Sequence, residues 1–201
     1  MYAVGHLALG YLSGKTASKI LNTNVNIPLL FLVSVLPDVD LLIPGLEHRG
    51  PLHSAIIFCL LFLPIFILFK KRAIPYFVAL IQHILIGDYL TGGTQLLWPI
   101  TTNLYPSGLG IEITSLTNIL IEWILFLTST AILFKTKDAW LLFRQHPSNM
   151  ILAVPVLTAL LPTLLSFPLY VSPELVIPHL IYMVLFTFSI LVDLKAILTK
   201  T

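Results

Sequence analysis

Runs of mostly apolar residues recur along this chain at about the 20-residue length that a helix needs to cross a bilayer. Their expected ranges are Tyr2 to Leu21, Ile27 to Leu46, Leu52 to Phe69, Ala73 to Leu90, Thr114 to Phe134, Met150 to Tyr170 and Ile177 to Lys195. Hydrophobic residues make up 57% of the chain, above the roughly 45–50% of soluble domains. These features predict an all-α fold, a polytopic transmembrane helical bundle of six to seven membrane helices.

The chain is predicted to form one integral membrane domain over residues 1–201, with two halves. Polar residues suited to metal binding gather in the first half, about 1–112, whereas the second half, about 113–201, is predominantly apolar and helical. The net charge of +2 and the lack of a basic patch with interleaved aromatic residues argue against a nucleic-acid partner. The lipid bilayer is therefore the expected environment, and oligomeric state is left open.

The basic residues predict an orientation in the membrane. If the chain crosses at each span, ten of the 11 Lys and Arg residues fall on one side and Arg49 alone falls on the other. Since cytoplasmic loops are enriched in Lys and Arg, the protein is expected in the inner, or cytoplasmic, membrane with Arg49 extracytoplasmic. Seven crossings result if the first helix spans the membrane, and six if it does not.

One stretch, from Leu36 to Ser54, concentrates ionisable groups in a chain of which only 10% is charged. It contains Asp38, Asp40, Glu47, His48, Arg49 and His53. Ionisable groups at membrane depth are costly and are read as functional candidates. Carboxylates with imidazoles are ligands for Zn²⁺, Mn²⁺ or Mg²⁺, so a divalent metal ion is the expected cofactor, with zinc the leading candidate.

Candidate ligands from several segments are predicted to meet near the outer ends of their spans. Asp38, His53 and Asp88 are expected to form one cluster, and His6 would join this layer if the first helix spans. His83 and Asp88 are five residues apart, which separates them by about 140° on an α-helix. A π-bulge near Gly87 would bring the two side chains onto one face.

Other interpretations of these residues remain open. The Leu36–Ser54 stretch would also suit an interfacial loop whose acids face water, and His83 alone would suit a hydrogen-bonded helix histidine. Arg49 would suit either a phosphate-binding role or an arginine that reaches the lipid headgroups. Glu122 lies deep in its span, and its role is not assigned.

The combined motifs resemble a known family. An early Gly-His at Gly5, LPDVD at Leu36, HRGPLHS at His48, and HILIGDYLT at His83 running on to LLWP resemble the YdjM-type inner-membrane proteins, described as membrane-bound metal-dependent hydrolases. The resemblance covers roughly Gly5 to Pro99. It implies metal-ligand roles for His6, Asp38, His53, His83 and Asp88. It also places Asp40, His48 and Arg49 close by, and we assign these three as catalytic residues.

These observations favour a membrane-embedded, metal-dependent hydrolase at the extracytoplasmic interface. A bound ion would activate water, Asp40 or Glu47 would accept its proton, and the substrate would be a phosphoester or ester of a lipid or lipid-linked molecule. One alternative is a transporter or channel that binds ions, although its coupling groups would be expected near the midplane. Another is a non-catalytic protein with a structural metal, whose ligand shell would be closed.

Overall fold

The computed structural model describes residues 1–166 and 170–198, and the described residues form helices and loops with a single isolated β-bridge between Thr94 and Tyr105. The predicted all-α class is therefore confirmed. Part of the predicted Met150–Tyr170 segment, including Pro168, lies outside the described residues, as does Lys200.

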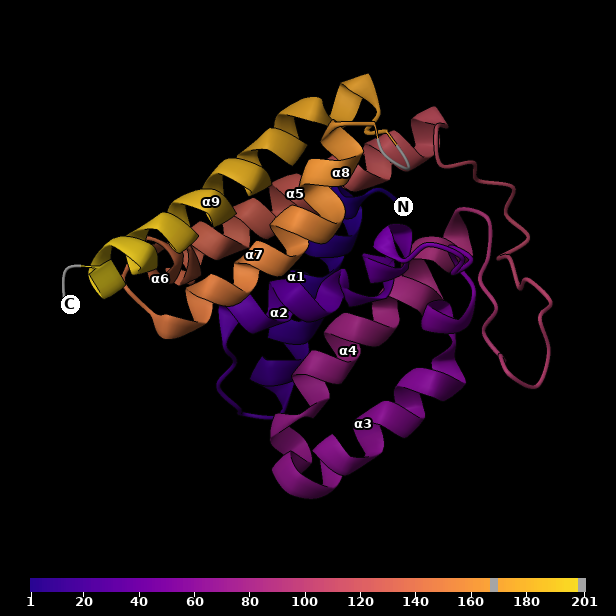
Figure 1. The fold of residues 1–201 in the computed structure, drawn as a ribbon, viewed down its shortest axis with the longest axis horizontal. Coiled ribbons are helices and arrows are strands. Elements are labelled where there is room, and N and C mark those ends of the chain that lie inside the picture. Colours follow the sequence, from indigo (N-terminus) through magenta and orange to yellow (C-terminus); the bar gives the residue numbers. More distant parts are fainter. Residues whose placement is uncertain (167–169, 199–201) are drawn as a thin grey trace.

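The first half of the chain begins with a helix that lies at the centre of the molecule. Helix α1 (Ala3–Ile20) contacts α2 (Ile27–Ser34), α4 (Ile74–Gln82) and α5 (Leu116–Lys135) (Figure 1). Its buried residues include Val4, Leu7 and Tyr11. Because α1 is surrounded by other helices, polar groups near its first turn are held away from water.

Helix α2 is much shorter than the apolar segment predicted from Ile27 to Leu46. Its first turn is capped by the Asn26 side chain, which accepts a hydrogen bond from the backbone N–H of Leu29 at 3.0 Å. It ends at Ser34, and the chain continues as a 3₁₀ helix, η1 (Leu36–Leu42), with Pro37 in its first turn. Proline removes a backbone donor, and the resulting break lets Asp38 and Asp40 both face inward.

Two antiparallel segments complete the first half. A short 3₁₀ turn, η2 (Pro51–His53), leads into α3 (Ala55–Phe69), which is capped by Ser54. The basic turn η3 (Lys70–Arg72) joins α3 to α4, and α4 continues directly into a π-helix, η4 (His83–Asp88). Helix α3 buries only Phe58 and Phe62, so most of its apolar surface has no protein neighbour.

The second half packs three longer helical segments against α1 and α2 (Figure 1). They are α5; the irregular helical segment made of η5 (Pro147–Leu152), α7 (Ala153–Pro155), η6 (Val156–Leu160, a π-helix) and α8 (Leu161–Leu164); and α9 (Val176–Leu198), which follows the 3₁₀ turn η7 (Pro173–Leu175). A short helix, α6 (Asp138–Leu142), follows α5. The prolines in the irregular segment explain its departures from α-helical geometry.

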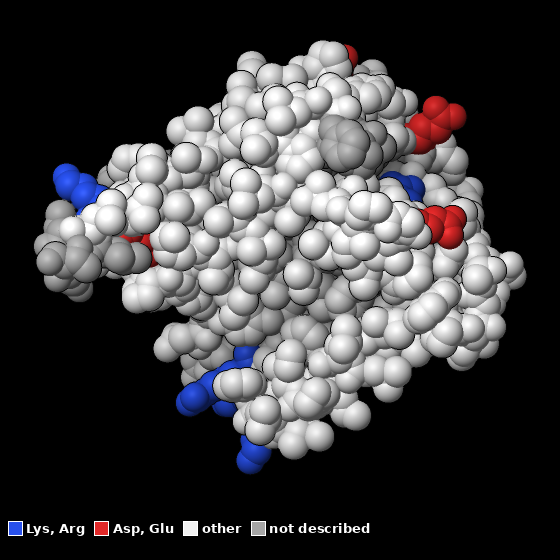
Figure 2. Space-filling model, viewed as in Figure 1, with Lys and Arg blue, Asp and Glu red and all other residues white. Residues whose placement is uncertain are grey.

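By length and composition, three of the described helical segments can cross a membrane: Leu116–Lys135, Pro147–Leu164 and Pro173–Lys195. A shorter apolar helix covers Ile74–Asp88. The predicted total of six to seven crossings stays a prediction. Charged side chains on the face seen in Figure 2 lie near its edges, with a broad uncharged surface between them, as expected for a chain embedded in lipid.

Candidate metal centre

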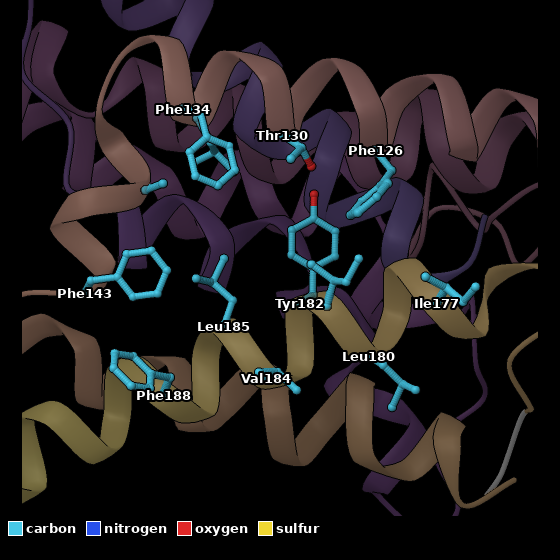
Figure 3. Close-up of a pocket in the computed structure, with 13 residues that line it drawn as sticks. Phe126, Thr130, Phe134, Phe143, Ile177, Leu180, Tyr182, Val184, Leu185 and Phe188 are labelled. Atoms are coloured by element: carbon cyan, nitrogen blue, oxygen red, sulfur yellow. The ribbon is translucent and has the colours of Figure 1, made fainter.

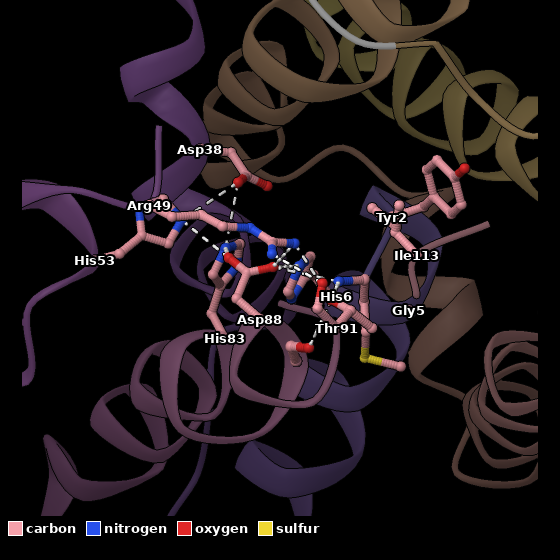
Figure 4. A network of polar contacts seen from close by, with 12 residues as sticks. Tyr2, Gly5, His6, Asp38, Arg49, His53, His83, Asp88, Thr91 and Ile113 are labelled. Carbon is pink, nitrogen blue, oxygen red and sulfur yellow. Dashed lines mark hydrogen bonds and ion pairs between the residues drawn. The ribbon is translucent and has the colours of Figure 1, made fainter. Parts of the chain in front are cut away.

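Four buried side chains from three segments converge in one cluster (Figure 4). Asp38 comes from η1, His53 from η2, and both His83 and Asp88 from η4. One potential ligand atom from each lies within 4.8 Å of those of the others. The expected convergence of Asp38, His53 and Asp88 is thus present in the structure, and His83 joins them.

The atoms at the centre of this cluster face one another without proper hydrogen bonds. His83 Nε2 lies 3.2 Å from Asp38 Oδ1, and His53 Nε2 lies 3.1 Å from Asp88 Oδ2. In the described part of the chain, His53 Nε2, His83 Nε2 and Asp88 Oδ2 have no hydrogen-bond partner, although all are buried. Buried polar atoms are normally paired, and a cation at their centre would satisfy all three. The residues present therefore fit a bound metal ion.

The π-helix explains how His83 and Asp88 share one face. The pair would point about 140° apart on an α-helix, but η4 spans His83 to Asp88 in the wider π form. Both side chains then reach the cluster, with His83 Nε2 3.4 Å from Asp88 Oδ2. The helix is therefore distorted near Gly87, as the sequence requires if His83 and Asp88 are to lie on one face. π-Bulges are frequent at functional sites.

The outward nitrogens of the two histidines have partners that orient their rings. His83 Nδ1 lies 2.8 Å from the carbonyl oxygen of Ser34, and His53 Nδ1 lies 3.1 Å from Asp40 Oδ2, off the line of an ideal hydrogen bond. Partners of this kind hold the imidazole in the tautomer that leaves Nε2 free for a metal. Both Nε2 atoms accordingly face the centre.

Asp40 is the hub of a second group beside the first. Its carboxylate lies 3.0 Å from His48 Nδ1 and accepts a hydrogen bond from the backbone N–H of Arg49 at 3.3 Å. Arg49 has a φ of 64°, a left-handed conformation that is costly for a side-chain-bearing residue. His48 lies next to one oxygen of the Asp40 carboxylate and His53 next to the other.

The surroundings of Asp40 in η1 and His53 in η2 favour the ionised carboxylate and the protonated imidazole. Burial opposes charge on Asp40, but interactions with His48 and His53 outweigh it and hold the pKa of Asp40 below its ordinary value. Burial likewise disfavours protonated His53, yet the carboxylates of Asp38, Asp40 and Asp88 raise the pKa of His53 well above its ordinary value. A proton on His53 and a bound cation would therefore compete for the same carboxylates.

The two oxygens of Asp88 have different surroundings. Oδ1 lies 3.1 Å from Arg49 Nη2, 3.2 Å from the amino group of Met1 and 3.4 Å from His6 Nε2. Oδ2 faces His53 and His83. Arg49 also donates to the carbonyl oxygen of Thr91 at 2.9 Å. These donors fix the Asp88 carboxylate so that its other oxygen points into the cluster.

His6 is close to the cluster but outside the group of four. Its ring stacks on that of His83, with centroids 3.6 Å apart and planes within 11°. A Cβ added at Gly87 would lie 2.4 Å from His6 Cε1, so the ring fits only because residue 87 has no side chain. The predicted roles of all eight residues, five as ligands and three as catalytic groups, stay predictions.

Sequence reasoning missed several supports of the site. Glu122 of α5 is fully buried and accepts hydrogen bonds from the backbone N–H groups of Tyr2 and Gly5 at 2.7 and 3.0 Å. The Asn118 amide donates to it at 2.9 Å. Helix α1 has no side-chain cap of its own, so Glu122 supplies that cap from another helix. The position of Glu122 inside an apolar span was the available signal.

A water-sized cavity opens beside the cluster. It measures about 30 Å³, and its lining combines Asp38, His48 and Thr163 with apolar residues such as Leu41 and Ile113. Such a volume can hold a water molecule that has polar partners. Since Asp38 borders this cavity and also belongs to the cluster, a water here would lie next to the candidate metal position.

Two larger hollows lie elsewhere. One of about 640 Å³ lies between Thr91 and the segment from Pro106 to Thr114. The other, about 520 Å³, lies between α5 and α9 and is lined almost wholly by apolar side chains such as Phe126, Phe134 and Phe188 (Figure 3). The latter has no carboxylate or imidazole in its lining, so it does not compete with the cluster as a metal centre.

In the described residues, the fold and the site together define an all-helical protein with three candidate membrane-spanning helices and a buried His/Asp cluster that could bind a metal ion. Comparison with known families agrees: the model of the YdjM inner membrane protein family matches residues 1–174, and the chain belongs to that family. No curated protein and no solved structure matches the chain.

Proposed function

We propose that this protein is a membrane-embedded, metal-dependent hydrolase that cleaves a phosphoester or ester of a lipid or lipid-linked substrate at the extracytoplasmic interface. The observation that carries the proposal is a set of three buried atoms without a hydrogen-bond partner among the described residues, His53 Nε2, His83 Nε2 and Asp88 Oδ2, which converge with the Asp38 carboxylate. Mixed imidazole and carboxylate donors favour zinc, with manganese or magnesium as alternatives.

A metal ion held by these four residues would lower the pKa of a bound water and polarise the attacked group. The chain's own residues supply the rest. The cavity bordered by Asp38 and His48 positions the water, and Asp40, 3.0 Å from His48 Nδ1, orients the His48 ring. His48 then accepts a proton from the water as a general base.

The proposed reaction balances as an ordinary hydrolysis. The water oxygen bonds to the phosphorus or carbonyl carbon, the bond to the leaving oxygen breaks, and the leaving oxygen takes a proton. Asp40 is the less suitable proton acceptor because its carboxylate already serves His48, His53 and the Arg49 N–H. Glu47 is exposed and accepts a hydrogen bond from Gln95, away from the cavity lining.

Arg49 has a positioning role in this proposal. Its guanidinium donates to Asp88 and Thr91, so it holds a ligand carboxylate in place. This arrangement offers less of the guanidinium to a phosphate than the sequence alone suggested. The extracytoplasmic orientation rests on the partition of Lys and Arg residues.

Two rival functions receive less support. A purely structural metal would have a closed ligand shell, whereas a water-sized cavity borders Asp38 here. A transporter would place its ion-binding groups near the membrane midplane between broken helices, whereas Asp38 and His53 lie in short 3₁₀ turns that are separate from the three candidate spans.

The test combines metal content with hydrolysis. Detergent-purified protein and its Asp38→Ala, His48→Ala and Glu174→Gln variants would be analysed for bound metal and for cleavage of phospholipids and carboxylic esters in mixed liposomes. We expect Asp38→Ala to lose metal and activity, and His48→Ala to keep metal but lose activity. Glu174 is exposed, so its variant should match the wild type. Bound metal without metal-dependent hydrolysis would favour the structural role, and metal content unaffected by Asp38→Ala would refute the site.

A further inference from the structure

We propose that the segment 91–111, termed here the interfacial loop, lies in the lipid headgroup region and brings the metal centre into contact with the membrane surface. No charged residue occurs between Asp88 and Glu112. A long loop exposed only to water would be expected to carry some charges, so their absence from this loop is unusual.

Four of the exposed side chains of the interfacial loop are large and apolar. Leu97, Ile100, Leu104 and Leu109 are 41, 78, 54 and 66% exposed, respectively. Isolated exposed leucines are common on proteins, but four in one uncharged loop form a candidate surface for lipid. Trp98 and Tyr105 also belong to the loop, and these residue types are enriched at membrane–water interfaces.

The apolar surface of the loop continues from helix α3, most of whose apolar side chains are exposed. The N–H of Ala55, in the first turn of α3, donates to the Leu96 carbonyl oxygen at 3.0 Å, and the Ser54 hydroxyl donates to the Trp98 carbonyl oxygen at 2.6 Å. On α3, Leu60 and Leu61 are more than half exposed. In a bilayer this surface of α3 faces lipid, so the attached loop meets the same leaflet.

The backbone of the loop limits how deep it can lie. Its described residues are turns and irregular structure with one isolated bridge, Thr94 to Tyr105. Irregular backbone exposed to the hydrocarbon core would leave polar groups unpaired, which is why such segments are not found there. The loop therefore fits the boundary between headgroups and acyl chains, where water still reaches the backbone.

The base of the loop is joined to the metal centre. Thr91 accepts hydrogen bonds from Arg49, which also holds Asp88, and the Gln95 N–H donates to the Arg49 carbonyl oxygen at 3.0 Å. The loop thus connects the membrane surface to a ligand carboxylate within a few residues. Resting on the proposed hydrolase function, this arrangement indicates a substrate with an acyl or prenyl chain that enters sideways from the leaflet.

Membrane contact can be measured without any enzymatic activity. Single cysteines at Ile100 and Leu104, in a Cys59→Ser background, would carry nitroxide labels in protein reconstituted into phosphatidylcholine–phosphatidylglycerol liposomes. Leu61 on α3 and Lys71 in the basic turn serve as lipid-facing and water-facing controls. The measurement is the ratio of collision rates with oxygen, which partitions into lipid, and with a water-soluble nickel chelate.

We expect the ratios at Ile100 and Leu104 to resemble that at Leu61, and ratios that resemble Lys71 would overturn the proposal. A second variant, Ile100→Asp with Leu104→Asp, should shift a label at Leu97 toward water while bound metal is unchanged. Hydrolysis of a lipid substrate should fall, but hydrolysis of a soluble short-chain ester should not. Loss of lipid contact with unchanged lipid hydrolysis would refute the delivery role. Because labelling needs no turnover, failure of the hydrolase proposal would show separately.

Discussion

Replacing Gly87 by alanine tests how the His6 ring is held beside the metal centre. The added Cβ would lie 2.4 Å from His6 Cε1 and 2.6 Å from His6 Nδ1, against ordinary contacts of about 3.4–4 Å. The ring would have to move by about 1 Å. It is stacked on His83 and lies 3.4 Å from Asp88 Oδ1, so the movement disturbs two residues of the cluster.

The magnitude follows from two opposing terms. Overpacking of a buried site costs about 1–3 kcal/mol, whereas alanine in place of glycine inside a helix gains about 0.5–1 kcal/mol. The φ of Gly87 is not in the left-handed region, so the backbone accepts alanine. In a His6→Ala background the steric term disappears and Gly87→Ala should become stabilising. Because the gain from alanine is the same in both backgrounds, the two should differ by the steric term alone, about 1–3 kcal/mol.

The assay is a double-mutant cycle on detergent-solubilised protein, with thermal unfolding of the wild type, both single variants and the double variant. For a chain of this size, 1 kcal/mol corresponds to about 2–4 °C in Tm. Zinc affinity, measured in parallel, should fall by about 10–100-fold in Gly87→Ala, as for other changes around metal ligands. Equal effects of Gly87→Ala in the two backgrounds would refute the packing argument.

Three further predictions concern the metal and the orientation. Zinc should raise the Tm of metal-free wild type but not of Asp38→Ala, because an ion bound by the folded state stabilises it; chelation should reverse the gain. Zinc affinity should rise with pH up to the elevated pKa of His53, because the metal must displace a proton from the ring. Below that pKa the affinity should fall about tenfold for each pH unit and each proton displaced. Titration calorimetry at several pH values measures this, and a pH-independent affinity would contradict the role of His53. In a Cys59→Ser background, an impermeant thiol reagent should label cysteine at Glu47 but not at Lys71 in intact cells, and the reverse pattern would invert the orientation.

Much of the candidate site was predictable because ionisable residues are rare in this chain. Asp38, His53 and Asp88 could be grouped from the sequence, since isolated charges at membrane depth are costly and need a partner. The five-residue spacing of His83 and Asp88 even indicated the helix distortion that the structure contains. Rare charged residues in an apolar chain can therefore be grouped even when they lie in different segments.

Other features depend on contacts that local patterns do not encode. The early end of α2 at Ser34 exposes a carbonyl oxygen to His83, a contact between residues 49 positions apart. The placement of His6 outside the group of four depends on how α1 packs against η4. The partners of the Glu122 carboxylate could not be predicted either, because they are backbone N–H groups of another helix.

That buried carboxylate has a consequence for how the chain can be divided. Glu122 belongs to the second half but binds the first turn of α1, directly beside His6. Gly5 permits the approach, since a Cβ there would lie 2.9 Å from Glu122 Cγ. A fragment that stopped at residue 112 would leave the α1 N–H groups without this acceptor in a water-poor environment. Fragments 1–112 and 113–201, co-expressed as separate chains, should assemble through this contact. Metal bound by the co-purified pair would then show that the two fragments have associated.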